Sequence, residues 1–177
     1  MSSALQLILI VLASLIPGLL WLRFFQLRDL YEREPARMLL RAFAMGALAV
    51  GVAAAVELPF SDWVLPEAPL FAQLFSAFVI IGLGEELFKA LGVYLAVYRS
   101  PEFDEPADGI IYGAAVGIGF SVVENILYAL AFGLAVAPIR ALIASLAHAC
   151  FSGIFGIFFG RARFSANPRG ELTRGLL

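Results

Sequence analysis

Apolar residues fill five long stretches of this chain, and polar residues gather in the short segments between them. Each stretch reaches the roughly 20 residues that an α-helix needs to cross about 30 Å of hydrocarbon. Backbone groups in lipid must be satisfied within the segment, which favours helices, and the short alternating runs typical of barrel strands are missing from the sequence. The pattern predicts an all-α, multi-pass transmembrane helical bundle with spans at residues 3–22, 38–58, 70–98, 109–132 and 138–160.

The composition points the same way. Of the 177 residues, 62% are hydrophobic and 15% are charged, whereas a soluble domain has about 45–50% apolar and about 25% charged residues. The single cysteine, Cys150, excludes a disulfide within the chain, and we interpret it as core filler rather than a nucleophile. We expect one integral membrane domain over residues 1–177, with the lipid bilayer as a partner and no nucleic acid.

Basic residues are unevenly distributed between the two sides of the predicted bundle. Nearly all of them lie in the segment after the first span or in the tail after the fifth. Because short cytoplasmic loops carry an excess of Lys and Arg, we predict that both segments are cytoplasmic and that the N-terminus lies outside. No Lys or Arg precedes the first apolar run, so we interpret it as a retained span rather than a cleaved signal peptide. Arg140, at the start of the fifth span, is the exception on the outer side.

Four ionisable side chains lie inside the predicted spans: Glu85, Glu86, Glu124 and His148. An ionised side chain at the bilayer centre costs roughly 2.5–3.5 kcal/mol on insertion scales, and such residues typically mark functional sites. These four come from three different spans, and Lys89 follows the first pair by one turn. We therefore expect them to meet inside the bundle.

The first pair of acids shares one potential partner. Lys89 stands four residues after Glu85 and three after Glu86, so either carboxylate can reach it on the helix surface. Adjacent residues point about 100° apart around a helix axis, and we expect one acid to pair with Lys89 while the other faces a cavity. The i,i+4 spacing favours Glu85 for the pair, which leaves Glu86 as the stronger candidate for chemistry and Lys89 as a charge partner.

Polar and aromatic neighbours accompany the other two ionisable residues. Phe120 precedes Glu124 by one turn and Asn125 follows it directly, while Ser152 lies four residues after His148 and shares its helix face. Asn125 fits either a role in the site or a hydrogen bond between helices, and Ser152 fits support of its own helix.

Three kinds of chemistry can use such a cluster. A Glu can act as general base on a water that a second polar group positions, with His148 and Ser152 stabilising the oxyanion. Alternatively, Glu86, Glu124 and His148 can bind a metal such as zinc, whose water attacks. A non-enzymatic bundle that translocates protons or ions is the third, and the missing internal repeat counts against it. The residue pattern leaves the choice open.

Three motifs, each on its own span, resemble a known family. They are Glu85-Glu86-Leu87-Phe88-Lys89, the run from Asp108 to Asn125 that contains Phe120 and Glu124, and His148 with Ser152. With Tyr31-Glu32-Arg33-Glu34-Pro35 before the second span, they make the chain similar to the PrsW family of bacterial intramembrane proteases. That family is related to the CAAX prenyl proteases and to bacteriocin-processing proteins. The resemblance covers nearly the whole chain from about residue 28.

The resemblance implies a hydrolase of the bacterial inner membrane, an intramembrane endopeptidase that cuts a single-pass membrane protein such as an anti-sigma factor. It implies Glu86 or Glu85 as the base, and Glu124 where the prenyl proteases have a water-positioning histidine. It also implies His148 as the oxyanion histidine and Ser152 in place of their asparagine. No cofactor is expected, although the family has also been classed among metallopeptidases, so zinc stays an alternative. Relatives generally continue past the basic segment into further hydrophobic helices.

Overall fold

The computed structural model describes residues 3–29 and 32–175, and this part of the chain is helical, with no strand; Tyr31 lies outside the described residues. Five helices within it are long and apolar enough to cross a membrane, which confirms the predicted fold. The elements are α1 (Ser3–Leu27), α2 (Ala36–Glu57), η1 (Leu58–Val64), α3 (Leu70–Phe75), η2 (Ser76–Leu83), α4 (Gly84–Ala96), α5 (Asp108–Phe132), η3 (Leu134–Val136), α6 (Ala137–Ile139), η4 (Arg140–Ala144), α7 (Ser145–Phe164) and α8 (Pro168–Arg174).

The spans differ from the predicted ones mainly at their ends. The first helix continues beyond the predicted boundary to Leu27, and the last apolar helix runs from Leu134 to Phe164. In both helices the part beyond the predicted C-terminal boundary carries Arg residues. Their long side chains can hold the charge away from the apolar body of the helix. The third span winds as a π-helix in its middle, at η2, and the fifth does so near its start, at η4.

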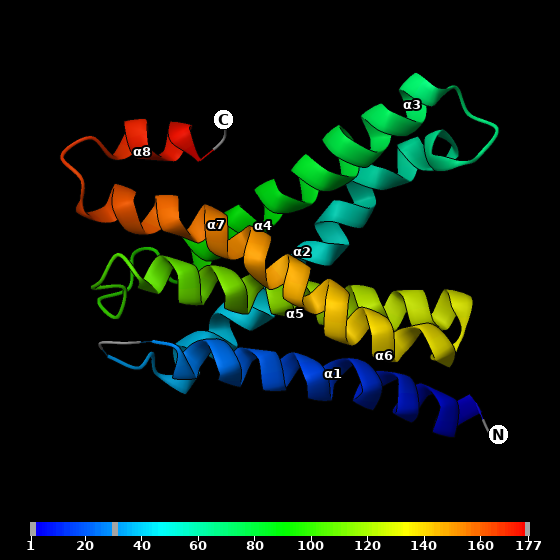
Figure 1. Ribbon diagram of the computed structural model, residues 1–177, viewed down its shortest axis with the longest axis horizontal. Helices are drawn as coiled ribbons and strands as arrows, with labels where there is room; N and C mark the ends of the chain where they lie inside the picture. The colour runs from blue at the N-terminus through cyan, green and yellow to red at the C-terminus, as the bar shows by residue number, and fades with distance from the viewer. Residues whose placement is uncertain (1–2, 30–31, 176–177) are drawn as a thin grey trace.

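Helix α5 is the centre of the bundle. About 72% of its most apolar stretch is buried, whereas the other four spans are buried to 33% or less. Helices α1, α2 and α7 pack around it, while α3 and the end of α2 diverge from the bundle at the upper right of Figure 1. Helix α8 folds back onto α7, near the basic end of the molecule.

Glycines allow α5 and α7 to approach closely. A Cβ on Gly109 would overlap the carbonyl oxygen of Gly156, and a Cβ on Gly156 would overlap that of Gly109. Further along α5, Gly117 lies directly against the carbonyl of His148. Small residues permit this backbone contact in lipid, which explains why these two spans lie side by side. The contact fixes the backbone of His148 against the central helix.

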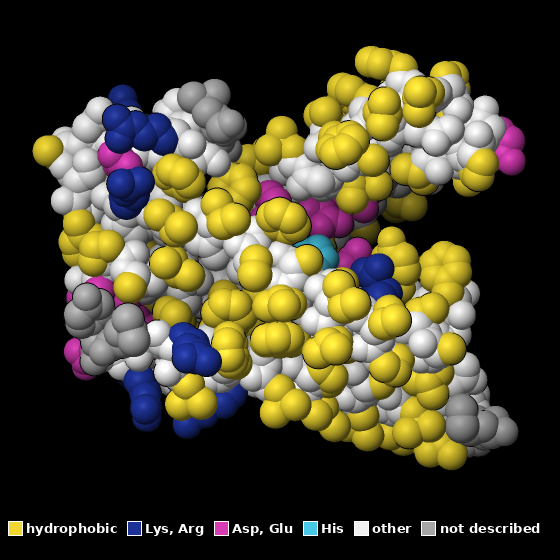
Figure 2. Space-filling model, in the orientation of Figure 1, with side chains coloured by type: hydrophobic (Ala, Val, Ile, Leu, Met, Phe, Trp, Pro, Cys, Tyr) yellow, Lys and Arg dark blue, Asp and Glu magenta, His cyan; other side chains and the backbone are white. Residues whose placement is uncertain are grey.

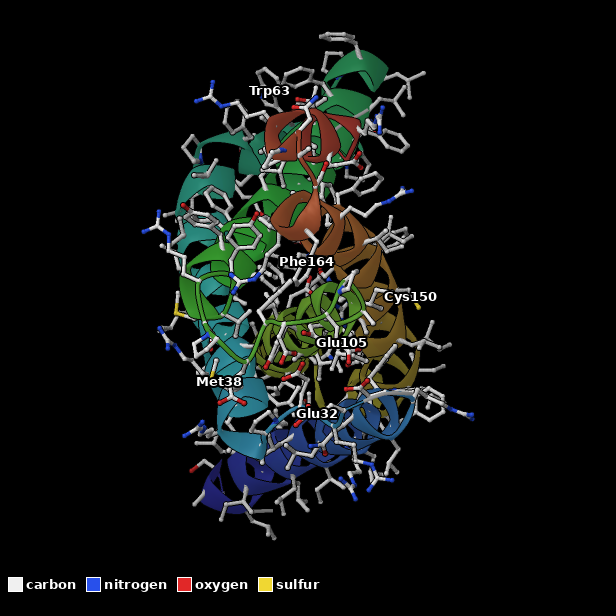
Figure 3. The ribbon with its side chains drawn as sticks, turned by 90° about the vertical axis from the view of Figure 1, so that its left-hand side faces the viewer. Glu32, Met38, Trp63, Glu105, Cys150 and Phe164 are labelled. Carbon is white, nitrogen blue, oxygen red and sulfur yellow. The ribbon has the colours of Figure 1, made fainter. Side chains whose placement is uncertain are left out.

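Cys150 does not fill the core. Its side chain is exposed on the outer side of α7, where Figure 3 shows the sulfur at the edge of the helix. The face of α7 toward α5 is taken by the small residues Ala149, Gly153 and Gly156. The packing therefore turns Cys150 away from the bundle, and the prediction of a core position was wrong.

A buried acidic cluster joins the segment before α2 to the start of α5. The Tyr112 hydroxyl is fully buried and donates a hydrogen bond to Glu34, which is itself only 4% exposed. Asp108 Oδ2 accepts the backbone N–H groups of Asp104 and Glu105 at 2.8 and 2.7 Å. Burial raises the pKa of Glu34 from 4.5 to about 8, and the negative charge of Asp108 adds to the effect.

Candidate active site

The ionisable residues predicted on three separate spans surround one cavity of about 520 Å³. Glu85 and Glu86 come from α4, Glu124 from α5 and His148 from α7, and Arg140 of η4 joins them. Figure 2 shows the hollow beside the diverging end of α2 and α3, with acidic, histidine and basic side chains at its floor. The fold thus collects in one place the charges that the sequence scatters over 64 residues, from 85 to 148.

Two π-helical segments flank this cavity. The segment η2 ends at Leu83, two residues before Glu85, and η4 begins at Arg140 and ends shortly before His148. Residues of both segments line the cavity, among them Ile81 and Gly82 of η2. A π-turn holds an extra residue and so redirects the side chains that follow, which is why such turns recur at functional sites.

Lys89 binds both acids of α4. Its Nζ lies 2.6 Å from Glu86 Oε1 and 3.3 Å from Glu85 Oε2, and its side chain is 1% exposed. The same nitrogen lies 4.4 Å from the centre of the Phe120 ring, a cation–π contact. An ammonium has three donors, so one lysine can serve several acceptors. The expectation that Lys89 would pair with one acid and leave Glu86 free was therefore wrong.

His148 connects the α4 charges to Glu124. Its Nδ1 lies 2.9 Å from Lys89 Nζ, and its Nε2 lies 3.0 Å from Glu124 Oε2. A lysine ammonium only donates, so Nδ1 is the acceptor and the ring proton is assigned to Nε2, which donates to Glu124. The Phe120 ring packs at 5.5 Å against the imidazole and holds its plane.

The contacts leave some carboxylate oxygens available. Glu124 accepts two hydrogen bonds, from His148 Nε2 and from Arg140 Nη2 at 2.9 Å, and both end on Oε2. Glu86 uses both oxygens, because Oε1 binds Lys89 and Oε2 accepts from Ser152 Oγ at 3.2 Å. Among the described residues, Oε1 of Glu85 and Oε1 of Glu124 have no hydrogen-bond partner.

Asn125 bridges helices from a fully buried position. Its Nδ2 donates to Ser121 Oγ at 3.2 Å and to Ser145 Oγ at 3.1 Å, and its Oδ1 accepts from Arg140 Nε at 3.1 Å. The amide therefore ties α5 to α7 and to η4. Of the two roles the sequence allows for Asn125, these contacts support the bridge between helices.

Arg140 is the charged residue lining this cavity that the sequence prediction of the site missed. It binds Glu124 and Asn125, and its guanidinium carbon lies 3.6 Å from the centre of the Tyr128 ring. A signal was present in the sequence, because Arg140 is the basic residue that departs from the positive-inside pattern. A lone basic residue inside an apolar stretch carries a desolvation cost and therefore indicates a specific partner.

Residues 34–177 match the family described as "PrsW family intramembrane metalloprotease". The chain belongs to the PrsW family. It is 42% identical over 161 residues to the Protease PrsW of Geobacillus kaustophilus (strain HTA426), a match that covers 90% of the chain and 69% of that relative. The Protease PrsW of Bacillus subtilis (strain 168) is 38% identical over 159 residues, with 89% and 71% covered. The Protease PrsW of Clostridioides difficile (strain 630) is 30% identical over 168 residues, with 92% and 68% covered.

No solved structure matches the chain. Membership of the PrsW family, with the five apolar helices, makes the chain a multi-pass membrane protein and an intramembrane protease. The family description names a metalloprotease, a class of enzyme whose active site holds a metal ion.

The donor set in this arrangement does not fit a metal ion. Zinc is held by nitrogen, oxygen or sulfur lone pairs at about 2.0–2.3 Å. Lys89 Nζ occupies the space between the α4 acids and His148 Nδ1, and Arg140 binds Glu124. In residues 3–29 and 32–175 no three His, Cys, Asp or Glu side chains are grouped so as to hold a metal. Two cationic side chains thus bind the carboxylates that a metal would need.

Proposed function

We propose that this PrsW-family protease hydrolyses a peptide bond of a membrane-anchored protein with a water that a glutamate activates. The observation that carries the proposal is the meeting of Glu85, Glu124 and His148 at one cavity in the membrane-spanning part of the chain. Each acid has one oxygen without a hydrogen-bond partner among the described residues, as a base for water requires.

The contact pattern supports Glu85 rather than Glu86 as the base. Both oxygens of Glu86 are engaged, by Lys89 and by Ser152, so this acid is suited to holding Lys89 in place. Glu85 keeps Oε1 available while Lys89 binds Oε2. Glu124, across the cavity, is the second polar group that positions the water. This reverses the preference for Glu86 that the helix spacing suggested.

The proposed reaction has a simple proton balance. Glu85 takes a proton from water as the water oxygen forms a bond to the carbonyl carbon of the substrate. His148 Nε2–H, which donates to Glu124 in the resting arrangement, is the donor that stabilises the developing oxyanion. The carbon–nitrogen bond then breaks, and Glu85 returns the proton to the leaving amine.

The proposed substrate is a single-pass membrane protein, such as an anti-sigma factor, in the bacterial inner membrane. Its support is the family and the apolar wall of the cavity, where Phe78 and Phe151 are 72% and 59% exposed toward the surroundings of the bundle. The distribution of basic residues supports an outer N-terminus and a cytoplasmic C-terminal tail.

Cleavage of a tagged single-pass membrane protein by the purified chain in proteoliposomes tests the proposal. Glu85→Gln, Glu124→Gln and His148→Asn should each lower kcat by about 100-fold or more, the range of general acid–base catalysis. Glu86→Gln should lower it less than Glu85→Gln. Glu67→Gln is the matched control, because Glu67 is exposed in the segment before α3. Full activity in all three site variants would overturn the assignment.

A further inference from the structure

Arg140 makes three contacts with one face of α5. Its Nη2 binds Glu124 Oε2 at 2.9 Å, its Nε binds Asn125 Oδ1 at 3.1 Å, and its guanidinium carbon lies 3.6 Å from the centre of the Tyr128 ring. The side chain is 23% exposed and lines the cavity that holds Glu85 and Glu124. The three partners give the guanidinium two hydrogen-bond acceptors and one aromatic ring face.

The partners on its two sides orient the Asn125 amide. Arg140 Nε can only donate, so it faces the carbonyl oxygen Oδ1, while Nδ2 on the other side donates to Ser121 and Ser145. Asn125 is fully buried, which keeps this orientation. The Asn125 amide is therefore a rigid anchor for the Arg140 Nε.

Glu124 receives two donors on the same oxygen. Arg140 Nη2 and His148 Nε2 both reach Oε2, at 2.9 and 3.0 Å. This arrangement directs Oε2 toward its two donors and leaves Oε1 as the oxygen that can meet a water. Without Arg140, Glu124 would keep one donor and could rotate about its side-chain bonds.

We propose that Arg140 is a positioning residue of the hydrolytic site, which fixes the Glu124 carboxylate against His148 by anchoring it to Asn125. The inference rests on the proposed function, in which Glu124 holds the attacking water. Arginine is required rather than any cation, because Nε and Nη2 of one planar guanidinium serve two neighbouring acceptors. A lysine ammonium places its donors at a single point and cannot reproduce this pair of bonds.

The first test is kinetic, in proteoliposomes with the tagged membrane substrate. Arg140→Ala and Arg140→Lys should each lower kcat by about 10- to 100-fold, because a displacement of about 1 Å costs that much, while KM stays within about twofold. Methylguanidinium added to Arg140→Ala should restore activity by about tenfold and leave Arg140→Lys unchanged. The rescue separates positioning from a general loss of folding.

The matched control is Arg99→Ala. Arg99 also lies over a tyrosine ring, 5.2 Å from the centre of Tyr94, and donates to its hydroxyl at 2.6 Å, but it lies outside the cavity. Arg99→Ala should keep the wild-type kcat and show no response to methylguanidinium. Wild-type kcat in Arg140→Ala, or a folded Arg140→Ala that methylguanidinium does not rescue, would overturn the inference.

A spectroscopic test does not depend on activity. His148 is the only histidine of the chain, so ¹⁵N-histidine labelling reports on one imidazole. Arg140→Ala and Arg140→Lys should both shift the Nε2 resonance, because Glu124 moves, and methylguanidinium should return it in Arg140→Ala. An unchanged Nε2 resonance in both variants would overturn the inference. If the Nε2 resonance shifts as predicted in the Arg140 variants but the wild type does not cleave the substrate, the result counts against the proposed function and not against the positioning role of Arg140.

Discussion

Lys89 Nζ lies 2.9 Å from His148 Nδ1, so the only lysine of the chain contacts its only histidine inside the bundle. The same nitrogen binds Glu85 and Glu86. One buried cation therefore binds two carboxylates and, by donating to Nδ1, leaves Nε2 as the imidazole nitrogen that donates. The arrangement makes Lys89 a structural centre of the site.

Replacement of Lys89 should destabilise the protein strongly. In Lys89→Met the two acids of α4 lose their common partner, and breaking a buried ion pair from one side costs about 3 kcal/mol or more. Thermal unfolding in detergent should show this loss. Arg37→Met is the control, because Arg37 pairs with Glu102 at 2.7 Å but is 74% exposed, and exposed pairs contribute about 1 kcal/mol or less. Equal stability of the two variants would contradict this role of Lys89.

Gly117 should be intolerant of any side chain. A Cβ there would overlap the carbonyl of His148 and approach Ser152 Oγ, so Gly117→Ala should push α7 away from α5 and cost about 1–3 kcal/mol. Cleavage should fall as well, because His148 moves with the backbone. Gly51→Ala on α2 is the matched control, since a Cβ at Gly51 meets open space. If both alanine variants behave alike, the close approach of α5 and α7 does not hold the site.

The stability of the protein should fall as the pH rises from about 4.5 to about 8. The pKa of Glu34 is raised from 4.5 to about 8 by burial, so in this window the folded protein keeps a proton that the unfolded chain has released. Stability then falls with pH by at most about 1.4 kcal/mol per unit. Measurements of the free energy of unfolding across this pH range should show the decrease in the wild type.

Glu34→Gln provides the comparison for this pH dependence. The amide keeps an acceptor for the Tyr112 hydroxyl but cannot ionise, so the decrease in stability between pH of about 4.5 and 8 should be smaller than in the wild type. Parallel pH profiles of the wild type and Glu34→Gln would show that Glu34 does not titrate with folding. Glu67→Gln, an exposed carboxyl, should retain the wild-type slope.

Much of the fold follows from the sequence because lipid imposes simple requirements. The number of spans follows from the length of the apolar runs, and the neighbourhood of α5 and α7 follows from glycines such as Gly109, Gly117 and Gly156. The cost of charges in lipid also predicted that residues from three spans would meet. Each of these rules concerns one span or a pair of spans, so it can be applied to a single sequence.

The internal contacts of the site could not be predicted in the same way. The reach of Lys89 to both acids depends on side-chain conformations, and the contact of Arg140 with Glu124 depends on where η4 lies beside α5. The outward direction of Cys150 depends on which face of α7 the small residues occupy. Each of these is a tertiary relationship that helix spacing alone does not contain.

Chelation should leave cleavage unchanged. Lys89 and Arg140 take the positions around the carboxylates that a metal would occupy, so a strong chelator should not lower kcat, and purified active protein should carry less than one metal per chain. A metal bound in a one-to-one ratio and lost together with activity would show that the resting contacts rearrange to bind it.

The most direct test of the account is the path of the solvent oxygen in a single turnover in H₂¹⁸O. If Glu85 activates a water, the new C-terminal carboxyl of the product takes up one ¹⁸O atom and the enzyme takes up none. Mass spectrometry of the product and of the enzyme peptide that holds Glu85 and Glu86 distinguishes the outcomes. An ¹⁸O atom in that enzyme peptide would contradict the account, because a glutamate oxygen would then have attacked the substrate itself.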